Sequence, residues 1–165
     1  MEDFCLKYPW GVKIEEDVKD ASARMIQAVE FGNIIYLCGN GGSFADCLHI
    51  SGELKKAFER KRTIPLEHET AFKNSQYCDL LLNLEPAFPV RVLGNNPVLQ
   101  TAFLNDVKVP ELFFAQDLYG QGKKGDILFG ISTSGNSKNI CAAVELAKVL
   151  EMKTIALTNQ EGGQL

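Results

Sequence analysis

A hydroxyl-rich stretch, Ser132-Thr133-Ser134-Gly135-Asn136-Ser137, has the composition and the position of a phosphate-binding turn. It follows the apolar run 126–131 and precedes an amphipathic run, 139–150. A strand, a turn and a helix in that order bring backbone N–H groups, hydroxyl donors and the positive end of a helix dipole together. We therefore interpret Ser132, Thr133, Ser134 and Ser137 as candidate phosphate ligands. The alternative is that Ser134 or Ser137 only caps the helix.

A second turn of this type, Gly39-Asn40-Gly41-Gly42-Ser43, follows the apolar run 34–38 and precedes a predicted helix, 44–60. Its glycines permit positive φ and close approach of a ligand, and Ser43 is the expected N-cap. The candidate ligands here are Asn40, Gly41, Gly42 and Ser43. A dinucleotide fingerprint would need glycine at Phe44, and a P-loop would need G-K-[ST]. The sequence therefore disfavours nucleotide cofactors.

The predicted helix 44–60 carries Asp46, His49 and Glu53 within about 60° of one another on the helical wheel. The pair His49 and Glu53 could share a metal, or could place a carboxylate base beside an imidazole. Glu53 adjoins Ile50, so we expect partial burial, which would suit a general base. The alternative is a solvated face with weak ion pairs, because Lys56 and Arg60 share this side.

Two further groups are weaker candidates. Asn105-Asp106 closes a predicted helix, 98–104, and is more typical of a cap than of a site. His68 lies between Glu67 and Glu69 and is expected to be a surface histidine.

The remaining pattern predicts a single α/β domain over residues 1–165. Non-alternating apolar strands are predicted at 34–38, 90–93, 126–131 and 153–158, and further helices at 12–31, 110–119 and 139–150. Such strands between helices favour a doubly wound parallel sheet, whose ligands bind at the carboxyl ends of the strands. Both polar turns lie at that end. Residues 63–87 are interpreted as an insertion with one short helix.

Composition excludes several classes of protein. The chain has 165 residues and a net charge of −4, which argues against a general nucleic-acid binder. Its five cysteines form no C-x-x-C pair and fit free thiols in a reducing compartment. No apolar run is long enough to span a membrane, and no signal peptide is recognised. We therefore expect a cytoplasmic protein.

The two turns, the Asp46/His49/Glu53 helix, Asn105-Asp106, and Thr158 with Gly162-Gly163 together resemble the sugar isomerase (SIS) domain. More narrowly, they resemble the sedoheptulose-7-phosphate isomerases, also called phosphoheptose isomerases. The resemblance implies a three-layer αβα, flavodoxin-like sandwich, commonly a homotetramer (a dimer is the alternative) with active sites between subunits. It also implies that the two turns, Asn105 and Asp106 hold a phosphosugar. Glu53 would be the catalytic base and, with His49, a zinc ligand in some members.

The implied reaction converts sedoheptulose 7-phosphate to D-glycero-D-manno-heptose 7-phosphate through an enediol, with a general base and acid. The family's second acid/base residue lies on a C-terminal helix, and this chain ends before it, so we expect the C-terminal part of the domain to be missing. One alternative is a non-catalytic SIS protein of the type that binds the bacterial replication initiator, although that branch need not keep Glu53. Another is an isomerase for a different phosphosugar.

Overall fold

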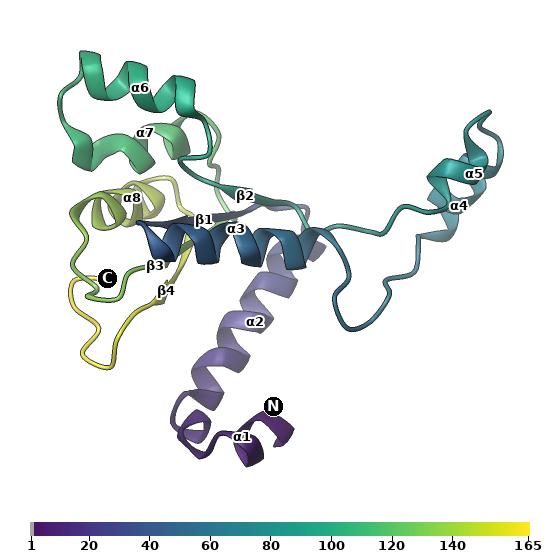
Figure 1. Cartoon of the computed structure of the whole chain (residues 1–165), viewed down its shortest axis with the longest axis horizontal. Coiled ribbons are helices and arrows are strands. Elements are labelled where there is room, and N and C mark those ends of the chain that lie inside the picture. Colours follow the sequence, from purple (N-terminus) through teal and green to yellow (C-terminus); the bar gives the residue numbers. More distant parts are fainter. Residues whose placement is uncertain (1) are drawn as a thin grey trace.

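The chain folds around a parallel sheet, seen in a computed structural model that describes residues 2–165 and the side chains from residue 4 onward (Figure 1). Within these residues the sheet has four strands in the order β2-β1-β3-β4, and each neighbouring pair is parallel. The strands are β1 Ile35–Gly39, β2 Val90–Val92, β3 Ile127–Ile131 and β4 Lys153–Leu157.

Helices connect the strands and cover both faces of the sheet. They are α1 Glu2–Lys7, α2 Glu15–Glu30, α3 Gly42–Lys55, α4 Leu66–Lys73, α5 Cys78–Leu81, α6 Pro97–Asp106, α7 Phe113–Tyr119 and α8 Lys138–Val149, with 3-10 helices at Pro9–Ile14 and Pro110–Leu112. None of the helices in the described part of the chain combines the length and the apolarity needed to cross a membrane.

Residues of β1 alternate between two separate cores. Tyr36 and Cys38 lie in a core with residues of α6, α7 and α8, whereas Ile35 and Leu37 lie in a core with residues of α2 and α3. All five residues of β1 are buried, as expected for a strand covered on both faces. The predicted three-layer α/β sandwich with a parallel sheet is confirmed.

The predicted buried character of the last strand, 153–158, is wrong. Ala156 and Leu157 of β4 are exposed, and Lys153, Thr154 and Ile155 are only partly buried. The reason is position, because β4 lies at the edge of the sheet and pairs with β3 alone among the described strands.

Several predicted helix boundaries also differ. Helix α3 begins at Gly42, because Gly41 adopts a positive φ of 53° at the N-cap, so Ser43 lies inside the helix and does not cap it. The helix ends at Lys55, because Lys56 is extended, and residues 56–60 do not continue its face. Asn105 and Asp106 are the last two residues of α6 and do not follow it.

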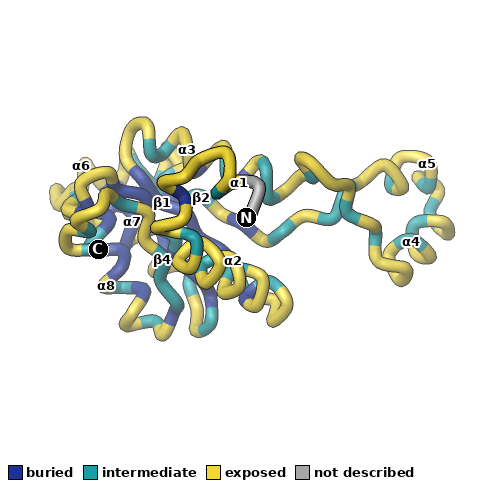
Figure 2. The backbone as a smooth tube through the Cα atoms, turned by 90° about the horizontal axis from the view of Figure 1, so that it is seen from below, coloured by how far each residue is buried: buried dark blue, intermediate teal, exposed yellow. Residues whose placement is uncertain are grey.

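Residues 63–87, called the arm below, project away from the sheet (Figures 1 and 2) and hold two short helices where one was predicted.

The base of the arm is held by Arg62, whose guanidinium donates to the carbonyls of Leu54 at 2.6 Å and Pro86 at 3.0 Å. The same guanidinium lies 4.3 Å from the centre of the Phe88 ring. The carboxylate of Glu85 accepts the backbone N–H of Ala57 at 2.7 Å. Both ends of the arm are therefore attached to the end of α3.

A buried carboxylate, Asp126, joins the amino ends of β1 and β3. Its side chain is fully buried, and its oxygens accept the backbone N–H groups of Ile34 at 2.8 Å and Lys123 at 3.0 Å. From the sequence, Asp126 was simply the first residue of an apolar strand. The structure shows that it supplies partners for two backbone donors.

We expect Asp126→Ala to lower the free energy of unfolding by about 2–4 kcal/mol, because it leaves two backbone donors without their charged acceptor. Urea denaturation followed by circular dichroism measures this loss. Asp79→Ala, at an exposed position in α5, is the matched control and should change stability by less than about 0.5 kcal/mol. A loss below about 1 kcal/mol for Asp126→Ala would contradict the structural role of this carboxylate.

Candidate phosphosugar site

The two polar turns lie side by side because β1 and β3 are neighbours in the sheet. Gly39, the last residue of β1, is the register partner of Ile131, the last residue of β3. The chain leaves β1 toward β2 on one side and enters β3 on the other, so this edge is the topological switch point of the sheet. Ligands of open parallel sheets bind at such points.

The turn after β1 depends on two glycines. A Cβ at Gly39 would come within 2.7 Å of the backbone of Ser43, which is too close for any other residue. Gly41 has a positive φ, and the backbone N–H of Ser43 donates to the carbonyl of Asn40 at 3.0 Å. The turn therefore closes tightly onto the start of α3, where the backbone N–H of Phe44 likewise donates to the carbonyl of Gly41 at 3.1 Å.

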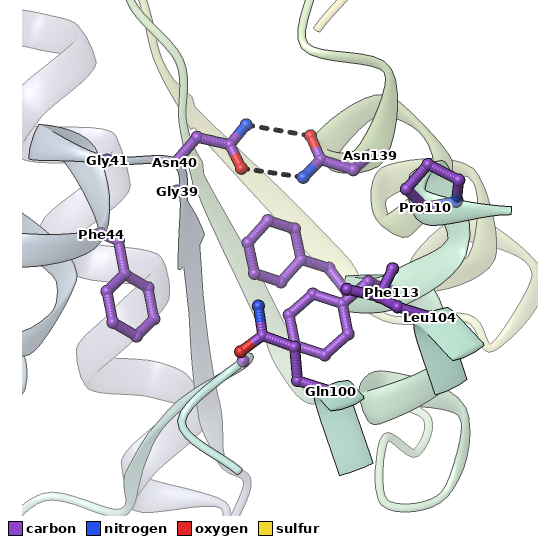
Figure 3. Close-up of a pocket in the computed structure, with 11 residues that line it drawn as sticks. Gly39, Asn40, Gly41, Phe44, Gln100, Leu104, Pro110, Phe113 and Asn139 are labelled. Carbon is purple, nitrogen blue, oxygen red and sulfur yellow. Dashed lines mark hydrogen bonds between the residues drawn. The ribbon is translucent and has the colours of Figure 1, made fainter. Parts of the chain in front are cut away.

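A reciprocal pair of amides links this turn to α8 (Figure 3). The Asn40 Nδ2 donates to Asn139 Oδ1 at 2.9 Å, and the Asn139 Nδ2 donates to Asn40 Oδ1 at 2.8 Å. Asn139 was not among the predicted site residues. Its place in the first turn of the helix after the serine-rich stretch is the signal that could have found it.

The serine-rich turn is held by its own side chains. Ser132 is buried, and its Oγ lies 3.0 Å from the Oγ of Ser137. The Oγ of Ser134 accepts the backbone N–H of Asn136 at 3.2 Å, while Thr133 and Ser134 are exposed. Ser137 stands at the N-cap position of α8, but its side chain makes no capping hydrogen bond, and Ser134 lies outside the helix. The capping alternative is therefore wrong for both side chains.

The last turn of the chain, 159–163, packs against the serine-rich turn at Gly135. A Cβ on Gly135 would overlap the carbonyl of Gly162, and the φ of Gly135 is positive. The carbonyl of Gly135 also accepts the backbone N–H groups of Gln164 at 2.9 Å and Leu165 at 3.2 Å. Only glycine fits this position, because the two turns touch through their backbones.

A cavity of about 350 Å³ opens beside the first turn. One wall carries the paired amides, and the opposite side is largely apolar (Figure 3). The residues that line it are Gly39, Asn40, Gly41, Phe44, Gly94, Gln100, Leu104, Pro110, Phe113, Phe114 and Asn139. Its lining does not include the serine-rich turn, Glu53, Asn105 or Asp106.

The acid and imidazole predicted on α3 are close to each other but distant from the first turn. Glu53 Oε1 lies 3.7 Å from His49 Nε2, and their side chains are 39% and 78% exposed. The partial burial expected for Glu53 is therefore observed, whereas His49 and Asp46 are exposed. Glu53 lies about three helical turns, or roughly 16 Å of rise, from Gly42.

The other weak candidates are exposed. The Asn105 Nδ2 donates to Asp106 Oδ1 at 2.9 Å at the end of α6, so these two side chains interact with each other. His68 lies on α4, with its Nε2 3.7 Å from Glu67 Oε1 and its side chain 60% exposed.

The donors around His49 do not complete a zinc site. Zinc in proteins usually has three or four protein ligands, whereas His49 and Glu53 supply two. No cluster of three His, Cys, Asp or Glu side chains suited to a metal occurs in the part of the chain that the structure describes. Burial, and to a smaller extent the nearby Asp46 charge, raises the pKa of the Cys47 thiol to about 11. Cys47 also lies in a buried core cluster, whereas the side chain of His49 is exposed.

Known proteins are similar to this chain in sequence and in architecture. The model of the SIS domain matches residues 12–159. Curated phosphoheptose isomerases are similar along most of the chain: the Shewanella frigidimarina protein is 35% identical over 152 residues, and the Coxiella burnetii protein is 35% identical over 150 residues. These alignments cover 92% and 91% of this chain. The chain spans only 65% and 63% of the length of these two relatives.

Solved structures of phosphoheptose isomerases have the same fold. The Francisella tularensis structure superposes with a TM-score of 0.70 at 28% identity, covering 98% of this chain and 76% of that one. The Neisseria gonorrhoeae structure superposes with a TM-score of 0.66 at 26% identity, covering 99% and 77%. With the family model matched over nearly the whole chain and two polar turns meeting at the switch point, this chain belongs to the SIS domain family.

Proposed function

We propose that this chain is part of a phosphosugar aldose–ketose isomerase that converts sedoheptulose 7-phosphate to D-glycero-D-manno-heptose 7-phosphate. The observation that carries the proposal is the meeting of the two polar turns at the switch point, in a chain 35% identical to curated phosphoheptose isomerases. The reaction moves a proton within one sugar, so it requires no nucleotide cofactor.

In this proposal the phosphate binds between the turns 39–43 and 132–137. Each turn precedes a helix of at least twelve residues, α3 or α8, whose N-terminus favours an anion. The exposed hydroxyls of Thr133 and Ser134 can donate to phosphate oxygens. Asn105 and Asp106 remain proposed contacts to the sugar.

Glu53 is the proposed base. The phosphate of the substrate is on C7, whereas the reacting carbons C1 and C2 are at the opposite end, so the anchor and the base must lie apart. Glu53 would take a proton from the carbon next to the carbonyl while the carbonyl oxygen gains a proton, giving an enediol. The proton on Glu53 then returns to the neighbouring carbon as the other enediol hydroxyl loses its proton. His49 Nε2, 3.7 Å from the carboxylate, can orient it.

In this proposal His49 and Glu53 would be two of the ligands of a bound zinc ion. The ion would need further donors beyond these two. A bound zinc would act as a Lewis acid on the carbonyl. The described donors do not complete the coordination of a zinc ion.

A cytoplasmic location and a homo-oligomer, a tetramer or a dimer, also belong to the proposal. The free cysteines fit a reducing compartment.

An apolar groove of about 300 Å³ lies along α2, lined by Met25, Ile26 and Val29 together with Leu54 and Phe88, and Ile26 is 56% exposed. The arm exposes Leu66, Leu80 and Leu84. A second copy of the chain is the proposed occupant, because exposed apolar surfaces of this kind are typical of subunit interfaces.

We expect Glu53→Gln to lower turnover of sedoheptulose 7-phosphate by about 10²–10⁴-fold, because glutamine cannot accept the proton. The affinity for the phosphosugar should change less than about threefold, since the phosphate anchor is untouched. A coupled assay of heptose 7-phosphate formation measures turnover, and calorimetry measures binding. Glu67→Gln, on the exposed face of α4, is the matched control with unchanged turnover.

An undiminished turnover in Glu53→Gln would refute the role of Glu53 as base. A wild-type protein that binds phosphosugars without converting any of them would favour the non-catalytic alternative. Turnover of another phosphosugar in preference to sedoheptulose 7-phosphate would keep the reaction class and change the substrate.

We expect Ile26→Asp to shift the protein toward smaller species, because a carboxylate in the α2 groove would have to be desolvated at the interface. Light scattering coupled to size-exclusion chromatography measures the mass in solution. Val149→Asp, at an exposed apolar position at the end of α8, is the control and should keep the wild-type mass. If both variants keep that mass, the groove is not the interface.

A further inference from the structure

We propose that Asn139 is a positioning residue that sets the orientation of the Asn40 amide at the phosphosugar site. The inference rests on the proposed function, because it concerns the group that would face the phosphosugar. It starts from the reciprocal amide pair, in which Asn40 and Asn139 exchange hydrogen bonds of 2.9 and 2.8 Å across the edge of the sheet (Figure 3).

The backbone of α8 determines which way the Asn139 amide points. The backbone N–H of Ile140 is shared between the carbonyl of Ser137 at 3.0 Å and Asn139 Oδ1 at 3.1 Å, and an amide nitrogen could not accept this N–H. The Oδ1 end of Asn139 is therefore assigned by a backbone donor, and its Nδ2 must face Asn40.

Asn40 takes its orientation from Asn139 in turn. A reversed Asn40 amide would place its Oδ1 against Asn139 Oδ1 and its Nδ2 against Asn139 Nδ2, and both contacts would be repulsive. In the observed orientation each amide uses one N–H within the pair and keeps the second. Both residues line the 350 Å³ cavity, so the second N–H of Asn40 is available to an oxygen of the ligand.

The pair also holds the two turns in one arrangement. Asn40 belongs to the turn after β1, and Asn139 belongs to the helix after the serine-rich turn, 99 residues later. A donor set on two separate turns binds a phosphate well only when the turns keep a constant spacing, because a preorganised site avoids the cost of ordering on binding. Asn139 therefore acts on the ligand through Asn40 and through this spacing.

The test is a cycle of Asn40→Ala, Asn139→Ala and the double variant. We expect each single variant to weaken binding of sedoheptulose 7-phosphate about tenfold by calorimetry, the loss of roughly one hydrogen bond to a charged group. Asn139→Ala should have no further effect on affinity in the Asn40→Ala background. Each single variant should lower Tm by a few degrees, and the double variant should lower it by less than the sum.

Two further variants complete the test, one for the donor group of Asn139 and one as a control. Asn139→Asp keeps the acceptor for Ile140 but removes the donor to Asn40, so it should weaken binding at least as much as Asn139→Ala. Asn83→Ala removes an amide that donates to the carbonyl of Asp79 in the arm, and affinity should stay within about twofold of wild type.

The outcomes separate this inference from the proposed reaction. Additive losses of Tm would show that the amides do not interact, and an unchanged affinity in Asn139→Ala would show that the pair does not position a ligand group; either result overturns the inference. If the affinities of the variants change as expected but the wild-type chain shows no turnover, the isomerase reaction is overturned and the positioning role is left intact. A wild-type chain that binds neither sedoheptulose 7-phosphate nor inorganic phosphate would overturn both.

Discussion

The pairing of β1 with β3 is the contact on which the rest of this structure depends. The two strands are buried neighbours, and their register places Gly39 opposite Ile131. Because both strands run in the same direction, their following turns emerge at the same edge. A shift of this register by one residue would exchange the two cores on either side of β1 and would separate the polar groups of the turns.

Polar side chains link the segments at both ends of this strand pair. At the amino ends, Asp126 accepts the backbone N–H groups of Ile34 and Lys123. At the carboxyl ends, Asn40 and Asn139 exchange hydrogen bonds. The first link is buried and contributes to stability, whereas the second borders a cavity and is available to a ligand. The same pair of strands thus supports both the fold and the proposed site.

The proposed phosphate anchor and the proposed base come from opposite ends of α3. The helix begins at the glycine turn and carries Glu53 close to its end, where Arg62 donates to the carbonyls of Leu54 and Glu53. A substrate with its phosphate and its carbonyl at opposite ends suits such a separation. The arm begins beyond this helix end, so its placement and that of Glu53 depend on the same contacts.

The sequence by itself determined the sheet, the two turns and the pairing of His49 with Glu53, because apolar periodicity, glycine positions and i, i+4 spacing are local properties. It also carried the family resemblance, since motif order is read along the chain. Only the tertiary structure decided that Asn139 meets Asn40, that Asp126 is a buried acceptor, and that β4 is an edge strand. The N-cap assigned to Ser43 failed because the positive φ of Gly41 starts α3 earlier. The first three features depend on residues far apart in sequence, which local patterns do not identify. The start of α3 depends on which of two adjacent glycines, Gly41 or Gly42, adopts the positive φ.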